Sequence, residues 1–547
     1  MTQPTSSRTQ PTSEGGTAPT EHRDVIIVGA GLSGIGAACR LQQELPGKDY
    51  MILEGRENIG GTWDLFRYPG IRSDSDMFTL AYPFKPWRDR KSIADGHSIR
   101  SYIVEAAREY GVTDRIRFGT RVVGASWDSA TARWTVETTT AAGTRRYTCQ
   151  FLFMCSGYYD YDRAYQPEFP GREDFAGTWV HPQFWPEDLD YAGKKVVVIG
   201  SGATAVTLIP SLAESAEHVT MLQRSPSYLT VLSSTDPVAD RLRRFLPARL
   251  AHTLLRFQYL ALTQGFYQLA RRRPEMVKKL LRGLALKFLH DESYVDRHFT
   301  PSYEPWDQRL CVMPEGDLFT AIHRGTASVV TDHIETITEK GVRLRSGEEL
   351  EADVIVSATG LSLKPLGGMT IHVDGEQVDI GKTVTYRGLM LSGVPNLAFC
   401  IGYVNASWTL RADLVARYVP RLLGLMDRER IAIATPAPTV SPDRPLLDLQ
   451  SGYVKRSEHL FPRQGRTDPW RLRQNFFLDA IGLGRADLRK DMLLTPASAL
   501  GSRSATVTKP SVAGIATDTA RTNTAHADTP QTDTARTDTA QKQEVAQ

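Results

Sequence analysis

The strongest constraint on the fold is an apolar run, a glycine-rich loop and a second apolar run near the start of the chain. Asp24 to Val28 (DVIIV) has the continuous apolar character of a parallel strand buried on both faces, and the sequence GAGLSG follows it at once. A helical stretch comes next, and a second short apolar run, Tyr50 to Leu53, ends on Glu54. This order predicts a strand–loop–helix–strand unit of the kind that binds dinucleotides.

The residues of this loop have separate tasks in such a unit. Gly29 permits the tight turn, Gly31 lets the backbone approach a pyrophosphate, and Gly34 lets the helix pack closely on the strand. The pyrophosphate charge is then held at the helix N-terminus. Glu54 follows Gly34 by twenty residues, the spacing at which an acidic side chain reaches the ribose hydroxyls of an adenine nucleotide.

A second unit of the same kind begins at residue 195. The apolar run Lys195 to Ile199 precedes the loop GSGATA, in which Gly200 and Gly202 take the first two glycine positions and Ala205 takes the third. The next strand leads into Arg224 and not into an acid, and an arginine there favours a nucleotide with a 2′-phosphate. The competing interpretation of Arg224 is a solvated cation at a strand end. The sequence thus predicts an α/β fold with two Rossmann-like dinucleotide-binding domains.

The segment between the two units, FAGTWVHPQFWP, carries a further pattern. Its specified positions are Phe175, Gly177, His181, Trp185 and Pro186. They match the signature of the Baeyer–Villiger branch of the class B flavin monooxygenases, which this chain resembles. A related branch that oxygenates nitrogen and sulfur usually carries Tyr or Phe where Trp185 stands. We interpret the segment as a hinge between the two units.

A second signature of the same family lies in residues 60–74, GGTWDLFRYPGIRSD. Its glycines and proline indicate an ordered loop, and composition alone would favour a surface loop with aromatic anchors. The family pattern is Gly-Gly-x-Trp-xxxx-Tyr-Pro-Gly-xxx-Asp, and every specified position is filled. The resemblance implies that Gly61 and Trp63 contribute to cofactor binding and that Asp74 is the active-site aspartate, next to the cofactor.

The resemblance also implies cofactors and chemistry. FAD is expected at the first loop and NADPH at the second. Arg309 matches the catalytic arginine of the family, whereas Gln308 replaces a lysine that commonly helps to hold the NADPH phosphate. NADPH would reduce FAD, O2 would add at flavin C4a, and the peroxyflavin would convert a ketone to an ester or lactone. The runs IGSGATAVTL and NASWTL look closest to the ethionamide-activating subgroup, which also oxidises sulfur in thioethers and thioamides.

Patterning along the chain predicts its domain organisation. Short apolar blocks between residues 122 and 154 predict an antiparallel meander, and a Leu- and Phe-rich stretch after the second loop predicts a helical insertion, the expected cap over the substrate. The predicted parts are a disordered tail (1–22), a first part of the FAD-binding domain (23–185), an NADPH-binding domain (186–376) with a helical insertion (236–304), a second FAD-binding part with the C-terminal segment (377–500), and a low-complexity tail (501–547).

Charge and cysteine content exclude several classes of protein. A net charge of +3 and the absence of any base-reading motif argue against a nucleic-acid partner. The five cysteines are scattered without C-x-x-C spacing, which argues against a disulfide scaffold, a dithiol reductase and a metal site. Neither a signal peptide nor a membrane span is visible, so we expect a cytoplasmic enzyme of undetermined oligomeric state.

Three questions stay open at this stage. One alternative function is oxygenation of nitrogen or sulfur by a flavin monooxygenase of the related branch, and another is a flavin pyridine-nucleotide oxidoreductase that does not oxygenate. The insertion carries thirteen Lys or Arg against four Asp or Glu in residues 241–300. Such a stretch more often forms a packed helix with a solvated basic face, and peripheral contact with an anionic membrane is the alternative.

Overall fold

The computed structural model describes residues 20–308, 310–447 and 449–500. Residues 1–19 and 501–547, which include most of the two predicted tails, lie outside the described residues, and so does Arg309, the predicted catalytic arginine. Within the described ranges, no helix is both long and apolar enough to cross a membrane.

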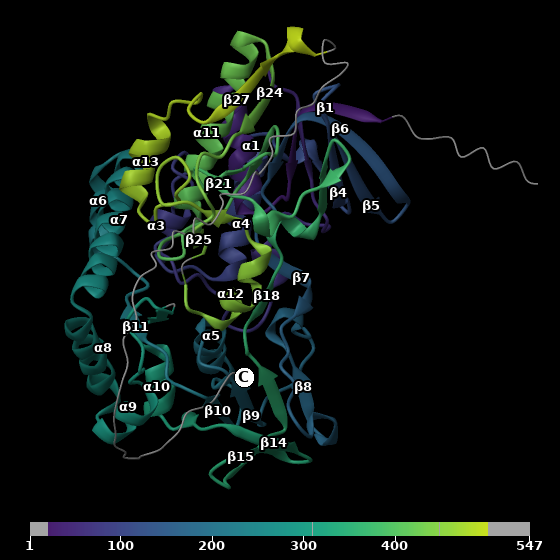
Figure 1. The fold of residues 1–547 in the computed structure, drawn as a ribbon. Coiled ribbons are helices and arrows are strands. Elements are labelled where there is room, and N and C mark those ends of the chain that lie inside the picture. The colour runs from purple at the N-terminus through teal and green to yellow at the C-terminus, as the bar shows by residue number, and fades with distance from the viewer. Residues whose placement is uncertain (1–19, 309, 448, 501–547) are drawn as a thin grey trace, which may run out of the picture. The chain divides into compact units, whose positions relative to one another are not determined.

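One sheet is built around the first predicted unit (Figure 1). β1 (Glu21–Val28) pairs in parallel with β2 (Tyr50–Leu53) on one side and with β6 (Gly143–Met154) on the other. α1 (Leu32–Glu44) connects β1 to β2 and packs its apolar side on one face of the sheet. β1 starts inside the segment predicted as N-terminal tail, because Glu21 to Arg23 pair with the start of β6.

An antiparallel meander extends this sheet, which confirms that prediction. β4 (Arg121–Asp128) pairs with β5 (Arg133–Thr140), and β5 pairs with β6. From residue 370 the chain returns to the same sheet, since β19 (Thr370–Val373) lies parallel to β4 and β23 (Leu397–Phe399) lies parallel to β6. The shorter strands of this sheet are β3 (Ile116–Arg117), β20 (Glu376–Gln377), β21 (Thr385–Tyr386) and β22 (Met390–Leu391).

The second sheet is wholly parallel, in the order β13-β10-β9-β17-β8. Its apolar strands are buried, and α5 (Ala203–Leu212) packs on it in the position that α1 has on the first sheet. The two sheets with their helices confirm the predicted α/β fold. β8 comes from the predicted hinge, so the chain enters this sheet before residue 186. The strands are β8 (Thr178–Val180), β9 (Lys195–Ile199), β10 (His218–Gln223), β13 (Ala327–Thr331) and β17 (Val354–Ser357).

Four consecutive helices lie between two strands that pair with each other, β11 (Leu229–Leu232) and β12 (Cys311–Pro314). The first begins where Asp236 accepts hydrogen bonds from the amides of the first turn and Pro237 occupies its first position. Figure 1 shows three of the four, α6 to α8, stacked along one side of the described chain. The helices are α6 (Pro237–Phe245), α7 (Ala248–Arg272), α8 (Pro274–Leu289) and α9 (Glu292–His298).

Smaller elements complete the described chain. Helices α2 (Thr62–Leu65), α3 (Met77–Leu80) and α4 (Gly96–Glu109) follow β2, and α10 (Asp317–His323) follows β12. Later helices are α11 (Trp408–Glu429), α12 (Gly452–Ser457) and α13 (Phe476–Gly484). Small sheets contain β7 (Tyr159–Ala164) with β18 (Leu361–Leu363), β14 (Ile334–Thr338) with β15 (Gly341–Leu344) and β16 (Glu349–Glu351), β24 (Ile431–Pro436) with β27 (Met492–Pro496), and β25 (Arg444–Pro445) with β26 (Arg463–Gln464).

The inner face of α7 is held against α3 by polar groups. Buried Arg256 donates from Nη1 to the carbonyl oxygens of Phe78, Thr79 and Ala81 at 2.8–3.1 Å. These carbonyls belong to the end of α3 and the residue after it, where the helix leaves acceptors without partners of its own. The inserted helices are thereby tied to the chain that follows the loop of residues 60–74.

His252 lies one turn before Arg256 on this face, and its burial predicts a stability that depends on pH. Burial, assisted by the charge of Arg256, lowers the pKa of His252 to about 4. Because this folded-state pKa is below the unfolded value, the native state binds fewer protons between about pH 6.5 and 4, and stability is lost as the pH falls through this window. The contribution of His252 is expected to make the free energy of unfolding about 2 kcal/mol lower at pH 5 than at pH 8. In thermal unfolding at both pH values, His252→Leu should lose less stability on acidification than the parent, whereas His97→Leu, at an exposed site, should not differ from it.

Candidate active site

The first glycine-rich loop has the geometry that a dinucleotide requires. Gly29 has φ +103°, and a Cβ atom there would lie 2.7 Å from the carbonyl oxygen of Cys155. A Cβ at Gly34 would lie 1.8 Å from the carbonyl oxygen of Gly29, so only glycine permits this close packing. A Cβ at Gly31 would meet its nearest protein atom, Gly61 Cα, at 3.5 Å, an ordinary contact. The protein itself therefore leaves room for a side chain at position 31. A glycine there fits the close approach of a ligand to the backbone.

Two helix N-termini converge on this loop. Neither α1 nor α11 has a side-chain cap, so the amides of their first turns are available to a ligand. Trp408, the first residue of α11, donates from Nε1 to the Ser33 hydroxyl in the first turn of α1 at 2.7 Å. Because each N-terminus carries partial positive charge, the pair favours an anionic group between them.

Glu54 is placed directly against the loop. Its Oε2 accepts a hydrogen bond from the Ala30 amide at 2.6 Å and its Oε1 accepts one from the Arg56 amide at 2.8 Å. Burial raises the pKa of this carboxyl, and the two amide hydrogen bonds oppose that shift. Glu54 is thus fixed against the first glycine-rich loop, and its contact with a ribose stays a prediction.

The loop of residues 60–74 lies beside the first glycine-rich loop. The Gly60 amide donates to the Ala30 carbonyl at 3.2 Å, and Gly60 and Gly31 form a parallel bridge. Gly61 has φ +57°, and a Cβ there would lie 3.1 Å from Gly31 Cα. Trp63 follows in α2 and packs against the core beneath the first sheet. The two loops therefore approach each other through glycines.

The same loop also reaches the second dinucleotide unit. A Cβ at Gly70 would lie 2.8 Å from the Thr207 carbonyl oxygen in α5. Arg72 pairs with Asp317 at the start of α10, at 2.5 Å. Residues 60–74 thus lie between the two glycine-rich loops.

Asp74 stands at the end of this loop, near the second unit. Burial raises the pKa of Tyr68, a hydrogen bond with Thr204 in the first turn of α5 opposes the shift, and the nearby Asp74 carboxylate adds to it. Asp74 is therefore close to Tyr68, which contacts α5. The structure does not describe Arg309, so the predicted Asp74–Arg309 pair stays a prediction.

The second glycine-rich loop resembles the first. Gly200 has φ +133°, and a Cβ there would lie 2.4 Å from the Ala358 carbonyl oxygen. A Cβ at Gly202 would meet no atom within 4 Å, and α5 begins there without a side-chain cap. Buried Ala205 packs in the apolar core under α5. This loop has open space at its second glycine and free amides, which fits a phosphate group.

Arg224 follows β10 at the edge of this loop. The neighbouring Ser225 carbonyl accepts a hydrogen bond from the Ser201 hydroxyl at 3.2 Å, which places the strand end against the loop. Arg224 is exposed and makes no ion pair with another described residue. Its guanidinium is therefore available to an anionic ligand, and the predicted contact with a 2′-phosphate stays a prediction.

The hinge signature has a structural reason at several positions. A Cβ at Gly177 would lie 2.4 Å from the Asp353 carbonyl oxygen, so glycine is required there, and Phe175 packs in the apolar cluster on the outer face of the second sheet. Buried His181 accepts the Gln183 amide hydrogen bond at 3.1 Å on Nδ1, and burial lowers its pKa. Trp185 meets Tyr191 edge-on at 6.3 Å, just before Pro186.

Gln308 is half-buried and forms a bridge with Pro305. Trp306 between them has φ +73° and packs edge-on against Tyr267 of α7 at 5.6 Å. Asp307 pairs with Arg271 at 2.8 Å. The residues that precede Arg309 are thus anchored to the inserted helices.

Comparison with known proteins decides the family. A family model described as pyridine nucleotide-disulphide oxidoreductase matches residues 26–239, which include both glycine-rich loops. The chain is 54% identical to the FAD-containing monooxygenase EthA of Mycolicibacterium smegmatis over 464 residues, or 84% of this chain and 94% of that protein. The chain belongs to the family of FAD-containing monooxygenases. The resemblance to the ethionamide-activating subgroup is thereby confirmed.

Solved structures of the same fold extend over most of this monooxygenase. An oxidized steroid monooxygenase bound to NADP matches with a TM-score of 0.69 at 22% identity and covers 87% of this chain and 100% of its own. A cyclohexanone monooxygenase in an open crystal structure matches with a TM-score of 0.67 at 20% identity, with the same coverage. At this identity the likeness concerns the fold.

Sequence reasoning missed a buried charge cluster in this monooxygenase. Asp64, almost fully buried in α2, pairs with Arg56 at 2.7 Å and with Arg100 of α4 at 3.0 Å. The cluster holds the start of the 60–74 loop against the chain after β2. Asp64 occupies an unspecified position of the family signature, so only its neighbourhood, and no pattern of its own, could have indicated it.

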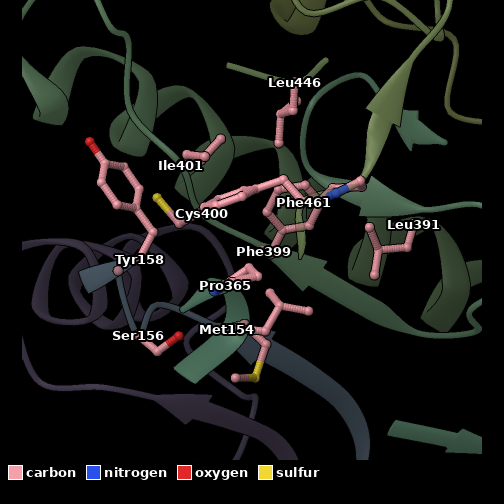
Figure 2. Close-up of a pocket in the computed structure, with 13 residues that line it drawn as sticks. Met154, Ser156, Tyr158, Pro365, Leu391, Phe399, Cys400, Ile401, Leu446 and Phe461 are labelled. Atoms are coloured by element: carbon pink, nitrogen blue, oxygen red, sulfur yellow. The ribbon is translucent and has the colours of Figure 1, made fainter. Parts of the chain in front are cut away.

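A small apolar pocket was also not foreseen. It lies where β6 and β23 end, has a cavity volume of about 20 Å³, and is lined by residues that include Met154, Tyr158, Phe399 and Cys400 (Figure 2). Such a volume admits about one water molecule. Burial raises the pKa of the Cys400 thiol to about 11, and all five cysteines are buried and free of disulfides. Burial also raises the pKa of the thiols of Cys39, Cys149 and Cys155, so these described thiols lack the low pKa that favours the dithiol chemistry in the name of the matching family model.

Proposed function

We propose that this FAD-containing monooxygenase uses NADPH and O2 to convert ketones to esters or lactones, and that it also oxidises sulfur in thioethers or thioamides. The observation that carries the proposal is the position of residues 60–74 between the two glycine-rich loops. An enzyme that first reduces its flavin and then oxygenates a substrate must bring both nucleotides together in one site. When bound, the flavin supplies the hydride acceptor and the oxygen-activating group.

The residues of the chain supply binding, orientation and charge. The open amides of α1 and the pair Gly31 and Gly61 fit the pyrophosphate of FAD, and Glu54 fits its adenosine ribose. The uncapped α5 and exposed Arg224 fit NADPH. Asp74 would orient Arg309 so that its cation meets negative charge that develops on oxygen. His181 and Trp185 would transmit the relative motion of the two units.

The presence of Trp185 favours this proposal over oxygenation of nitrogen or sulfur alone, because the related branch usually carries Tyr or Phe there. The name cyclohexanone monooxygenase, carried by a protein of the same fold, makes a cyclic ketone the first substrate to try. Purified enzyme should be given NADPH, isotopically labelled O2 and either cyclohexanone or a thioether. One labelled oxygen in a lactone supports the proposal. A labelled sulfoxide without lactone would favour the related branch, and NADPH oxidation without any labelled product would favour a non-oxygenating oxidoreductase.

Arg224→Ala is expected to lower the affinity for NADPH about ten- to a hundredfold and to leave the affinity for NADH almost unchanged. The loss of one charge-assisted hydrogen bond to a phosphate costs about 1.5 to 3 kcal/mol. Steady-state KM and kcat for both nucleotides would measure the preference, with Arg324→Ala as an exposed control outside the loop. Gln308→Lys should shift the preference the opposite way. Equal damage to NADH and NADPH in Arg224→Ala would reject the 2′-phosphate contact.

A further inference from the structure

The large apolar side chains that are exposed in this protein are concentrated on four helices. Ten of the sixteen among the described residues lie on α6, α7, α8 and α13. Six of these are more than half exposed, namely Phe245, Phe257, Leu262, Met276, Leu280 and Ile481. Single exposed apolar residues are ordinary, whereas a concentration of them marks an interaction surface.

These side chains share one side of the molecule. Leu250, Leu254 and Phe257 follow one another at helical spacing along the outer face of α7, while Arg256 and the rest of the inner face pack on α3. Phe257 meets Phe477 of α13 edge-on at 6.0 Å, which joins α13 to the same surface. Figure 1 shows α6, α7 and α8 stacked along one side of the described chain, with α13 beside α6 and α7. We call the outward faces of these four helices the docking surface.

The docking surface also carries unneutralised positive charge. Residues 241–300 have a net charge of +9 from thirteen Lys or Arg and four Asp or Glu, so the remainder of a chain with net +3 carries −6. Eight of these thirteen cations are exposed and make no ion pair with another described residue, among them Arg244, Arg249 and Lys279. Arg244 lies over the ring of exposed Phe245 at 5.7 Å, so cation and apolar group are presented side by side.

We propose that the docking surface binds anionic lipid bilayers. Anionic headgroups neutralise the cations, and the phenylalanine, leucine and methionine side chains insert at the boundary of the acyl chains. An anionic bilayer therefore accounts for both the basic and the apolar side chains of the docking surface. A second copy of this chain would bring the same cations together and is disfavoured by repulsion. Since no described helix crosses a membrane, the protein lies on the bilayer surface. This proposal does not depend on which substrate is oxidised.

The FAD-loaded full-length protein should be sedimented with vesicles of phosphatidylcholine and phosphatidylglycerol in equal parts, and with vesicles of phosphatidylcholine alone. Binding is expected to the anionic vesicles only and should weaken as salt is raised. The variant R244Q/R249Q/K279Q should bind roughly a hundredfold more weakly, at about fivefold for each cation. Phe257→Ser should bind the anionic vesicles about tenfold or more weakly, since it removes an exposed aromatic side chain that the bilayer would bury.

Matched controls separate the docking surface from general charge and hydrophobicity. R108Q/R145Q/R324Q removes three exposed arginines elsewhere that make no ion pair with described residues, and Val123→Ser removes an exposed apolar side chain from β4. Both should bind vesicles as the parent does. Unchanged FAD content and melting temperature would show that each variant is folded; if Phe257→Ser is destabilised, Leu280→Ser on α8 tests the same point.

Several results would overturn the proposal. Equal binding to both vesicle types would reject the role of the cations, and no binding at low salt would reject a bilayer partner altogether. Self-association of the free protein that disappears in Phe257→Ser would instead identify the surface as an interface between copies of this chain. Loss of binding in the control variants to the same extent would show that the four helices have no special part in it.

Discussion

Arg309→Ala is expected to lower the yield of ester or lactone from a ketone by at least about a hundredfold while FAD stays bound. Oxygen insertion beside a carbonyl passes through negative charge on oxygen, and removal of one donor to such an oxyanion costs about a hundred- to a thousandfold in kcat. Arginine is suited to this task because it keeps its charge at any working pH. The preceding residues are anchored by the Asp307–Arg271 ion pair, so the backbone before the substituted residue is restrained.

This expectation is checked by product mass and NADPH consumption measured together. In Arg309→Ala, NADPH should either be oxidised with formation of hydrogen peroxide or scarcely be consumed. Asp74→Ala should also lower the yield of ester or lactone, but by a smaller factor. Conversion of a ketone at the parent rate by Arg309→Ala would disprove the role of this arginine. Sulfoxidation that survives while ketone oxidation is lost would show that sulfur follows a route without a fixed cation.

Gly31→Val is expected to yield a folded protein that has lost its FAD. The valine side chain meets no protein atom closer than 3.5 Å at Cβ, so the loop can keep its structure. It does occupy the space through which the pyrophosphate reaches the amides of α1. Loss of about two charge-assisted hydrogen bonds, at 1.5 to 3 kcal/mol each, lowers the FAD affinity by about a hundredfold or more.

The absorbance ratio of flavin to protein after purification measures this effect, and circular dichroism verifies the fold. Gly47→Val is the matched control, because a Cβ at Gly47 meets nothing within 4 Å and lies outside the loop. Gly34→Ala should behave differently from Gly31→Val and lose stability, since its Cβ would lie 1.8 Å from the Gly29 carbonyl oxygen. A Gly31→Val protein with the full complement of FAD would reject the assignment of this loop.

The parts of the fold that the sequence predicted are those encoded by local patterns. The apolar runs that became β1, β2, β9 and β10 are continuous in the sequence, and each glycine-rich loop follows its strand directly. Alternation between apolar and polar residues likewise indicated the meander of β4 to β6. By contrast, nothing local shows that β8 pairs with β17, which follows it by more than 170 residues. Strand order in a parallel sheet depends on contacts between distant segments.

The same division applies to the candidate site. The glycine spacings and the position of Glu54 follow from the backbone path that any dinucleotide imposes, so they can be read without a structure. Sequence alone does not show that Asp64 is buried between Arg56 and Arg100, or that Arg411 of α11 pairs in the core with Asp479 of α13. Burial of a charge is stable only when distant partners meet it, and those partners have no fixed spacing.

The sequence by itself determined the two nucleotide-binding units, the family and the order of its signatures, because short-range stereochemistry requires certain residues at certain spacings. Only the tertiary structure decided what lies between them. Contacts from Gly60 and Gly61 to the first loop and from Gly70 and Arg72 to the second unit place residues 60–74 between the nucleotide loops. The sequence also showed that the helices α6 to α8 are rich in apolar and basic residues. Which of these side chains are exposed depends on which face of each helix packs against the core, and only the structure shows that.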